Sequence, residues 1–111
     1  MTTFEFILKL DIEQFSDEEI ERLYEAGCDD GLPGSVGGVA EILFGREAES
    51  FGEAVSSAMR DVGRSGVAAA IVSIVPLDAA HQTDADDFNR ALSLLDRFHR
   101  ADVQAWPVGH A

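Results

Sequence analysis

The sequence predicts an α+β fold, in which helices cover one face of an antiparallel sheet. Two stretches of the chain lead to this prediction. Residues 37–76 have the pattern of a strand, a helix and a second strand in close succession. Residues 4–10 alternate between apolar and mostly polar side chains, which is the period of a half-buried strand. At 111 residues the chain has room for one hydrophobic core, so both stretches belong to one domain.

The first strand is followed by a loop at residues 11–15 and then by a helix. The apolar positions of the strand are Phe4, Phe6, Leu8 and Leu10. Ser16 with Glu19 three residues later matches a capping box, and Gly27 is placed to end the helix. The buried face of this helix is expected to consist of Ile20, Leu23 and Tyr24.

The glycine-rich segment that follows predicts a short edge strand and a hairpin turn. Residues 28–36 are rich in turn formers, and the pair Gly37-Gly38 comes directly before an apolar run. The segment lacks the Lys-Ser/Thr ending of a phosphate-binding loop and does not open a helix. A hairpin is therefore the better interpretation.

The centre of the chain carries the clearest periodicity. A strand is predicted after the turn, with Val39, Ile42, Leu43 and Phe44. Ser50 with Glu53 begins a helix whose apolar stripe consists of Phe51, Ala54, Val55, Ala58, Met59 and Val62. Gly63 and Gly66 supply the stop. Residues 67–75 are nearly all apolar and are expected to form a strand covered on both faces or by a partner.

A third helix is predicted near the C-terminus, capped by Thr83 with Asp86. Its apolar stripe is Phe88, Ala91, Leu92, Leu95 and Phe98, and residues 103–106 can add a short extended segment. This tail either covers the open face or edge of the sheet or forms a dimer contact. The candidate contact residues are Phe88, Leu92, Leu95 and Trp106.

Together these elements follow the order strand, helix, short strand, strand, helix, strand. This is the order of a ferredoxin-like βαββαβ two-layer sandwich, here with an additional C-terminal helix. The core is expected at residues 1–76, and residues 77–111 are expected to form a helix and tail that pack on the same domain.

The charge of the chain restricts its partners. Twenty-one acidic residues face eight basic ones, which gives a formal net charge of −13. Such a chain is repelled by nucleic acid and by anionic membranes, so direct binding to either is not expected. A basic protein partner, a surface that imitates nucleic acid, or simple solubility is compatible with this charge. The sequence has neither a leader-like apolar segment nor a run of transmembrane length, which predicts a cytoplasmic protein.

Signals for catalysis, metals and cofactors are weak. Cys28 stands alone beside two aspartates with no base to activate it, so a buried structural cysteine is expected. His81, His99 and His110 are scattered and form no metal-binding pair. The loop at residues 11–15 has neither the arginine of an acylphosphatase nor the CxxC of a metal carrier. We therefore expect a protein that is not an enzyme and holds no cofactor.

The first helix and the loop after it are strongly acidic. Residues 11–30 hold nine acids and a single base, Arg22. Asp17, Glu21 and Glu25 recur every four residues and so share one outer face of the helix. The candidate partner-binding face consists of Asp17, Glu18, Glu21, Glu25, Asp29 and Asp30. The alternative is a solvated surface that only keeps the protein soluble.

Several short phrases resemble one bacterial family. They are the run Tyr24-Glu-Ala-Gly-Cys-Asp-Asp, the pair Gly37-Gly with Val39, Phe44 with Arg46-Glu-Ala, and Ala58-Met-Arg-Asp-Val before Gly66. The resemblance covers about residues 3–76. This part of the chain is similar to the N-terminal ferredoxin-like domain of small bacterial helix-turn-helix proteins, which are DNA-binding regulators. Residues 83–100 depart from that family, because they supply one acidic helix with no turn glycine and no recognition helix. The resemblance implies a dimerisation or partner-binding platform and transfers no functional residue.

These observations favour a non-enzymatic regulatory or protein-interaction domain that binds a protein partner or dimerises. One alternative is an acidic inhibitor that mimics nucleic acid and docks on a basic groove, as anti-CRISPR proteins do. A small-molecule-sensing module is a further alternative, supported by the predicted fold alone.

Overall fold

The computed structural model describes residues 1–94. Its elements follow the predicted order of strands and helices. They are β1 (Thr2–Leu10), α1 (Asp17–Glu25), β2 (Gly31–Val36), β3 (Val39–Ala48), α2 (Phe51–Arg64), β4 (Ile71–Pro76), the 3-10 turn η1 (Ala79–His81) and a helix that occupies residues 82–94. The predicted α+β class is confirmed.

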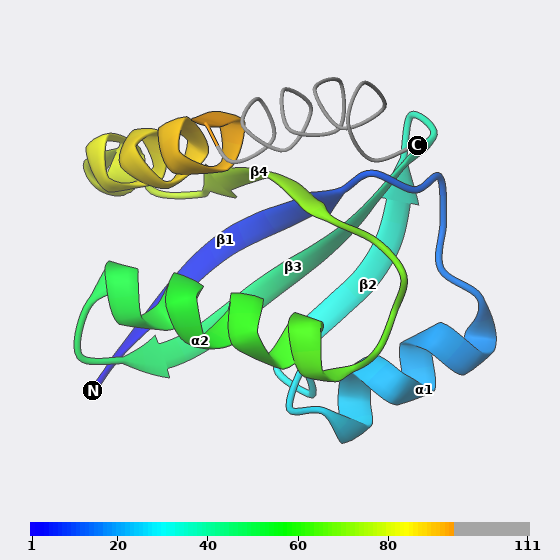
Figure 1. Cartoon of the computed structure of the whole chain (residues 1–111). Coiled ribbons are helices and arrows are strands. Elements are labelled where there is room, and N and C mark those ends of the chain that lie inside the picture. The colour runs from blue at the N-terminus through cyan, green and yellow to red at the C-terminus, as the bar shows by residue number, and fades with distance from the viewer. Residues whose placement is uncertain (95–111) are drawn as a thin grey trace, which may run out of the picture.

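The four strands form one antiparallel sheet with the spatial order β2-β3-β1-β4. The two longest strands, β1 and β3, lie at its centre and pair from Thr2 with Ala48 to Lys9 with Glu41. In Figure 1 α2 runs across the front of the sheet and α1 lies at the lower right, near the end of α2. One face is thus covered by α2, and the buried Leu23 of α1 joins the same core. Among the described elements, no helix lies over the other face, which we call the open face.

The hydrophobic core lies between the sheet and the helices. The four predicted apolar positions of β1 are all buried, which confirms the alternation in that strand. β3 contributes Ala40, Ile42 and Phe44 from alternate positions, and α2 contributes the residues of its apolar stripe. Phe6 stacks on Phe44, with ring centroids 5.4 Å apart. Alternation along the strands therefore sends one set of side chains into the core and the other set to the open face.

The N-terminal caps of α1 and α2 follow the predicted signals. Ser16 and Glu19 form a complete capping box, in which each side chain accepts a hydrogen bond from the other residue's backbone N–H. Ser50 caps α2 by accepting from the N–H of Glu53. The prediction for the buried face of α1 was wrong at Tyr24, which is 41% exposed. Leu23 is the residue of α1 that is fully buried in the core. The neighbouring Tyr24 lies about 100° around the helix from Leu23 and therefore points outward.

Two other predicted helix ends were wrong. Gly63 lies inside α2, which ends at Arg64, so only Gly66 marks the stop. Thr83 does not cap the third helix but lies inside it, because the 3-10 turn η1, capped by Asp78, leads directly into a helix that begins at residue 82.

The strand predicted at residues 67–75 begins four residues later, as β4 at Ile71. The preceding backbone makes other hydrogen bonds: the N–H of Val67 donates to Ser65 Oγ, and that of Ala69 donates to the carbonyl of Val67. Asp11 and Ala70 exchange two further bonds, one of them through the carboxylate of Asp11. These local partners replace a sheet ladder, although the composition is suited to a strand.

The helix at residues 82–94 lies beside β4 and packs on the core. Ala85 is fully buried, and Phe88 and Leu92 pack against the core cluster. The side-chain amide of Asn89 accepts from the N–H of Ile74 and donates to its carbonyl, at 2.7 and 2.9 Å. Figure 1 shows this helix running along the β4 edge of the sheet. One side chain thus takes the place that a neighbouring strand would occupy.

Candidate interaction surfaces

The open face carries an apolar row that crosses all four strands. Leu32 pairs with Leu43, Leu43 with Ile7, and Ile7 with Val75, so one side chain from each strand lies in register. Leu32 is 66% exposed, and Leu43 and Val75 are each 37% exposed. We call these four residues the apolar row. Four aligned aliphatic side chains on one uncovered face are a feature of protein-binding surfaces.

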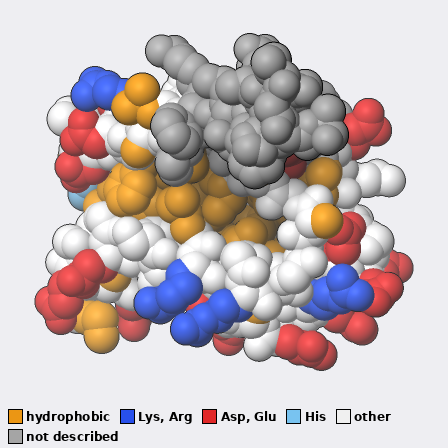
Figure 2. Space-filling view, viewed as in Figure 1, with side chains coloured by type: hydrophobic (Ala, Val, Ile, Leu, Met, Phe, Trp, Pro, Cys, Tyr) orange, Lys and Arg blue, Asp and Glu red, His pale blue; other side chains and the backbone are white. Residues whose placement is uncertain are grey.

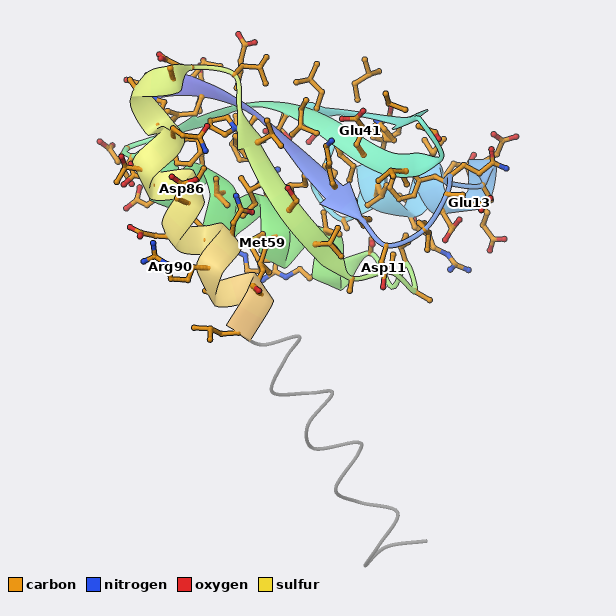
Figure 3. The ribbon with its side chains drawn as sticks, turned by 90° about the horizontal axis from the view of Figure 1, so that it is seen from above. Asp11, Glu13, Glu41, Met59, Asp86 and Arg90 are labelled. Atoms are coloured by element: carbon orange, nitrogen blue, oxygen red, sulfur yellow. The ribbon has the colours of Figure 1, made fainter. Side chains whose placement is uncertain are left out.

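Charged residues flank the apolar row on both sides. Lys9 lies two residues from Ile7 along β1 and pairs across the strands with Glu41, while Glu5 lies two residues from Ile7 in the opposite direction. Figure 3 shows Glu41 on the far side of the sheet from Met59, which belongs to α2. Lys9 is the only lysine in the chain. Among the described residues, it makes no salt bridge.

The two edges of the sheet are closed against strand addition. On β4 the outward-facing backbone of Ile74 is bonded to Asn89, and two residues further along, Pro76 has no N–H to offer. On β2, the two-residue turn makes Val36 and Val39 a hydrogen-bonded pair. Because hydrogen-bonded and non-hydrogen-bonded pairs alternate, Pro33 and Ile42 form a non-hydrogen-bonded pair, and the backbone of Pro33 points to the free edge. Proline at such positions prevents edge-to-edge pairing. Of the sheet's surfaces, the open face is therefore the better suited to assembly.

The turn between β2 and β3 confirms the predicted hairpin. Gly37 and Gly38 have φ values of 59° and 77°, the left-handed conformation that both central residues of a type I′ turn require. This turn sets the register that aligns Leu32 with Leu43. The glycine pair therefore helps to build the apolar row.

The predicted acidic face divides into two parts in the structure. Asp17, Glu18, Glu21 and Glu25 are exposed on α1, and acidic side chains gather over this helix at the lower right of Figure 2. Glu18 accepts a 2.6 Å hydrogen bond from Arg22 one turn later. Asp29 and Asp30 lie in the loop before β2, outside the helix. Asp29 is exposed, but Asp30 is held by a salt bridge with a buried arginine.

That arginine, Arg46 on β3, was missed by the sequence reasoning. It occupies an inward-facing position between Phe44 and Ala48 and is 7% exposed. Its Nε and Nη2 donate to the two carboxylate oxygens of Asp30, at 2.8 and 2.9 Å. The sequence signal was available, because position 46 continues the alternation of core residues 40, 42 and 44.

The remaining donors of Arg46 reach two other segments. Nη1 donates to Asp61 at 3.0 Å and to Ser57 at 3.1 Å, both on α2, and Nη2 donates to the carbonyl of Gly27 at 2.9 Å. Hydrogen bonds to Asp30 raise the pKa of the guanidinium above its usual value, more than burial lowers it. The cation therefore stays charged and joins β3, α2 and the loop after α1.

Cys28 is buried as predicted, next to this ion-pair cluster. Burial raises the pKa of its thiol to about 11, and the nearby carboxylate of Asp61 adds to the effect. A thiol with this pKa is almost fully protonated at neutral pH and is a poor nucleophile. The residue acts as a small apolar side chain of the core.

A shallow cavity of about 350 Å³ lies at the start of β1 and the end of β4. Its lining residues are Thr2, Thr3, Phe4, Glu5, Leu77, Asp78 and His81. The imidazole of His81 stacks on Phe51 at 4.8 Å and meets the edge of Phe4 at 5.2 Å, so it completes an aromatic cluster. In residues 1–94, no group of three or more His, Cys, Asp or Glu side chains is placed to hold a metal ion.

Of the four candidate tail contacts, Phe88 and Leu92 face the chain's own core. Leu95 and Trp106, with His99, His110 and the extended segment predicted at residues 103–106, lie outside the described residues. None of the helices within residues 1–94 has the length and apolar character needed to cross a membrane.

Comparisons of the chain with models of protein families, with curated proteins and with solved structures found no match. The resemblance of residues 3–76 to the N-terminal domain of helix-turn-helix regulators stays a prediction.

Proposed function

We propose that the chain is a non-enzymatic regulatory domain of the ferredoxin-like βαββαβ type, which acts by binding a protein through its open face. The apolar row is the observation that supports this function. No helix within residues 1–94 covers the second face of the sheet, and four aligned aliphatic side chains there stay partly in water unless a partner covers them.

The surroundings of the row favour a protein partner over other ligands. The row is flat and spans the width of the sheet, whereas small-molecule sites are concave. Its edges carry both signs of charge, with Lys9 on one side and Glu5 on the other. An apolar centre with a charged rim is the usual composition of a protein–protein interface.

A pair of substitutions tests this function. Leu43→Arg places a charge in the middle of the apolar row, and Tyr24→Arg places the same charge on α1, across the sheet. Each variant serves as bait in native extract at low and high salt, after circular dichroism has shown that it folds. We expect salt-resistant partners to be lost with Leu43→Arg and kept with Tyr24→Arg. Equal capture by both variants would argue against the open face.

The exposed acids of α1 favour a second candidate function. Asp17, Glu21 and Glu25 repeat at the spacing of one turn on a free helix face and, among the described residues, make no salt bridge. A row of carboxylates on a rigid helix can occupy a basic groove that normally holds phosphates. The chain would then act as a nucleic-acid-mimicking inhibitor of a basic protein.

Charge reversal on α1 separates this candidate from the first. Glu21→Lys with Glu25→Lys should abolish capture of a basic, salt-released partner, because opposite charges would face its groove. Asp17 is left unchanged, since its negative charge stabilises the start of the helix. Glu49→Lys with Asp87→Lys makes the same change in net charge at exposed positions away from α1 and should keep the partner. Loss with both pairs would indicate only a nonspecific charge effect.

A further inference from the structure

We infer that the partner on the open face is a second copy of this chain, related by a twofold axis that runs along the apolar row. This inference rests on the proposed function and names its partner. In such a dimer the two sheets pack face to face, and each residue of the row meets the same residue of the other copy. Leu32, Leu43, Ile7 and Val75 would thus form a continuous apolar layer.

The charges beside the row favour this axis over a twofold axis along either central strand. Rotation about the row exchanges its two flanks, so Lys9, two residues to one side of Ile7, lies over the partner's Glu5, two residues to the other side. Symmetry makes this ion pair occur twice. Glu41 then lies over the partner's Gly45 rather than directly over a carboxylate, and the partner's Glu5, one strand away, faces Lys9.

A twofold axis along a strand has the opposite result. About β1 it would place Lys9 over the partner's Lys9 and Glu5 over the partner's Glu5, and about β3 it would place Glu41 over the partner's Glu41. Like charges brought together in an interface cost several kcal/mol. Among face-to-face dimers with a twofold axis, the charge pattern therefore favours the axis along the apolar row.

The area of the face is compatible with a dimer. Four strands about 4.8 Å apart and roughly 20 to 30 Å long give a footprint on the order of 500 Å². Side-chain relief brings the accessible area nearer to the ~800 Å² per partner of a typical stable interface. The closed edges of β2 and β4 leave face-to-face packing as the way in which two of these sheets can associate.

Sedimentation equilibrium of charge variants tests the orientation. Lys9→Glu and Glu5→Lys should each raise the dimer dissociation constant on the order of tenfold or more, and the double swap should restore it to within a few-fold. Glu49→Lys, which lies outside the strands, is the control for net charge and should not weaken the dimer. If neither single variant raised the dimer dissociation constant, the proposed axis would be overturned.

Zero-length carbodiimide coupling provides an independent readout. Lys9 is the only lysine, so a covalent dimer joined through a lysine must use it, and peptide mass spectrometry should find it linked to Glu5. Within one chain these residues are four apart on a strand, roughly 13 Å between Cα atoms, too far for direct coupling. Lys9→Arg keeps the charge but removes the amine, so it should lose the link and keep the dimer.

The two proposals can fail separately. A chain that stays monomeric at every concentration would overturn the second copy as partner. If Leu43→Arg still abolished capture of another protein, the open face would keep its proposed function. If the dimer formed but Leu43→Arg did not weaken it, the open face would not be the dimer interface and this inference would be overturned, while the capture experiment would still decide the proposed function.

Discussion

At the scale of single residues, Arg46 is the main polar contributor to the structure. Its five N–H groups are all used, on two carboxylates, one hydroxyl and one carbonyl. The guanidinium also lies 5.1 Å from the centre of the Phe44 ring. Complete pairing is what makes a buried charge tolerable, because an unpaired one would lose its hydration without compensation.

Removing this side chain should destabilise the protein strongly. Arg46→Met should lower the free energy of unfolding by about 3 kcal/mol, since Asp30 and Asp61 would lose their buried partner. Arg46→Lys should restore part of this, because an ammonium lacks the bidentate geometry. Arg60→Met, at an exposed position of α2, should change stability by less than about 0.5 kcal/mol. Urea unfolding measures all three, and a loss below about 1 kcal/mol for Arg46→Met would contradict this account.

Cys28 should make stability depend on alkaline pH. Its pKa is raised from 9.0 to about 11 in the folded chain, so between these values the folded state keeps a proton that the unfolded state loses. Rising pH therefore favours unfolding, and roughly 2 kcal/mol present below pH 9 should be lost by pH 11. Urea unfolding of wild type and Cys28→Ala from pH 8 to pH 11 isolates this contribution. Parallel curves would show that the thiol is not desolvated.

At the scale of elements, the helix at residues 82–94 protects the sheet. Asn89 binds both backbone groups of Ile74, while Ala85 and Phe88 anchor the helix to the core. A primary amide offers a donor and an acceptor side by side, which matches the two groups of an exposed strand residue. The helix therefore closes an edge that would otherwise be open to another strand.

Loss of the Asn89 amide should loosen this edge. Asn89→Ala should lower the free energy of unfolding by about 1–2 kcal/mol, because two part-buried backbone groups lose their partner. Amide hydrogen exchange at Ile74 should become faster. Ser93→Ala, at an exposed position of the same helix, is the control and should leave that exchange rate unchanged. Equal protection in Asn89→Ala would mean that the bonds contribute little.

At the scale of the whole molecule, the net charge of −13 opposes compaction. Acids are spread over α1, the loops and the helix at residues 82–94, with few basic residues between them. Three of the five salt bridges among the described residues join side chains within one helix, so they contribute little to tertiary stability. The fold is held by its core and by the Arg46 cluster against this repulsion.

Added salt should therefore stabilise the protein. Raising NaCl from about 20 mM to about 500 mM shortens the screening length from roughly 20 Å to roughly 4 Å. We expect the free energy of unfolding to rise by about 1 kcal/mol, measured at low protein concentration so that association does not contribute. The variant with Glu21→Lys and Glu25→Lys carries less net charge and should respond less. An equal response in both proteins would show that salt acts in another way.

The α+β class, the order of the elements, the N-terminal caps of α1 and α2 and the hairpin turn at Gly37-Gly38 could be predicted from the sequence. These features depend on residues close together in the chain: apolar periodicity, Ser-x-x-Glu spacing and paired glycines. The exposed acids of α1 could be predicted for the same reason, because positions four residues apart share one helix face.

The features that join distant segments are visible only in the folded chain. The hydrogen bonds of Arg46 with Asp30 and Asp61, and those of Asn89 with Ile74, join residues at least 15 positions apart. The later start of β4 depends on local hydrogen bonds that replace a sheet ladder. The apolar row also joins distant segments, since its four residues come from four strands. No local pattern specifies such contacts, because sheet order and register are set by the packing of the whole core.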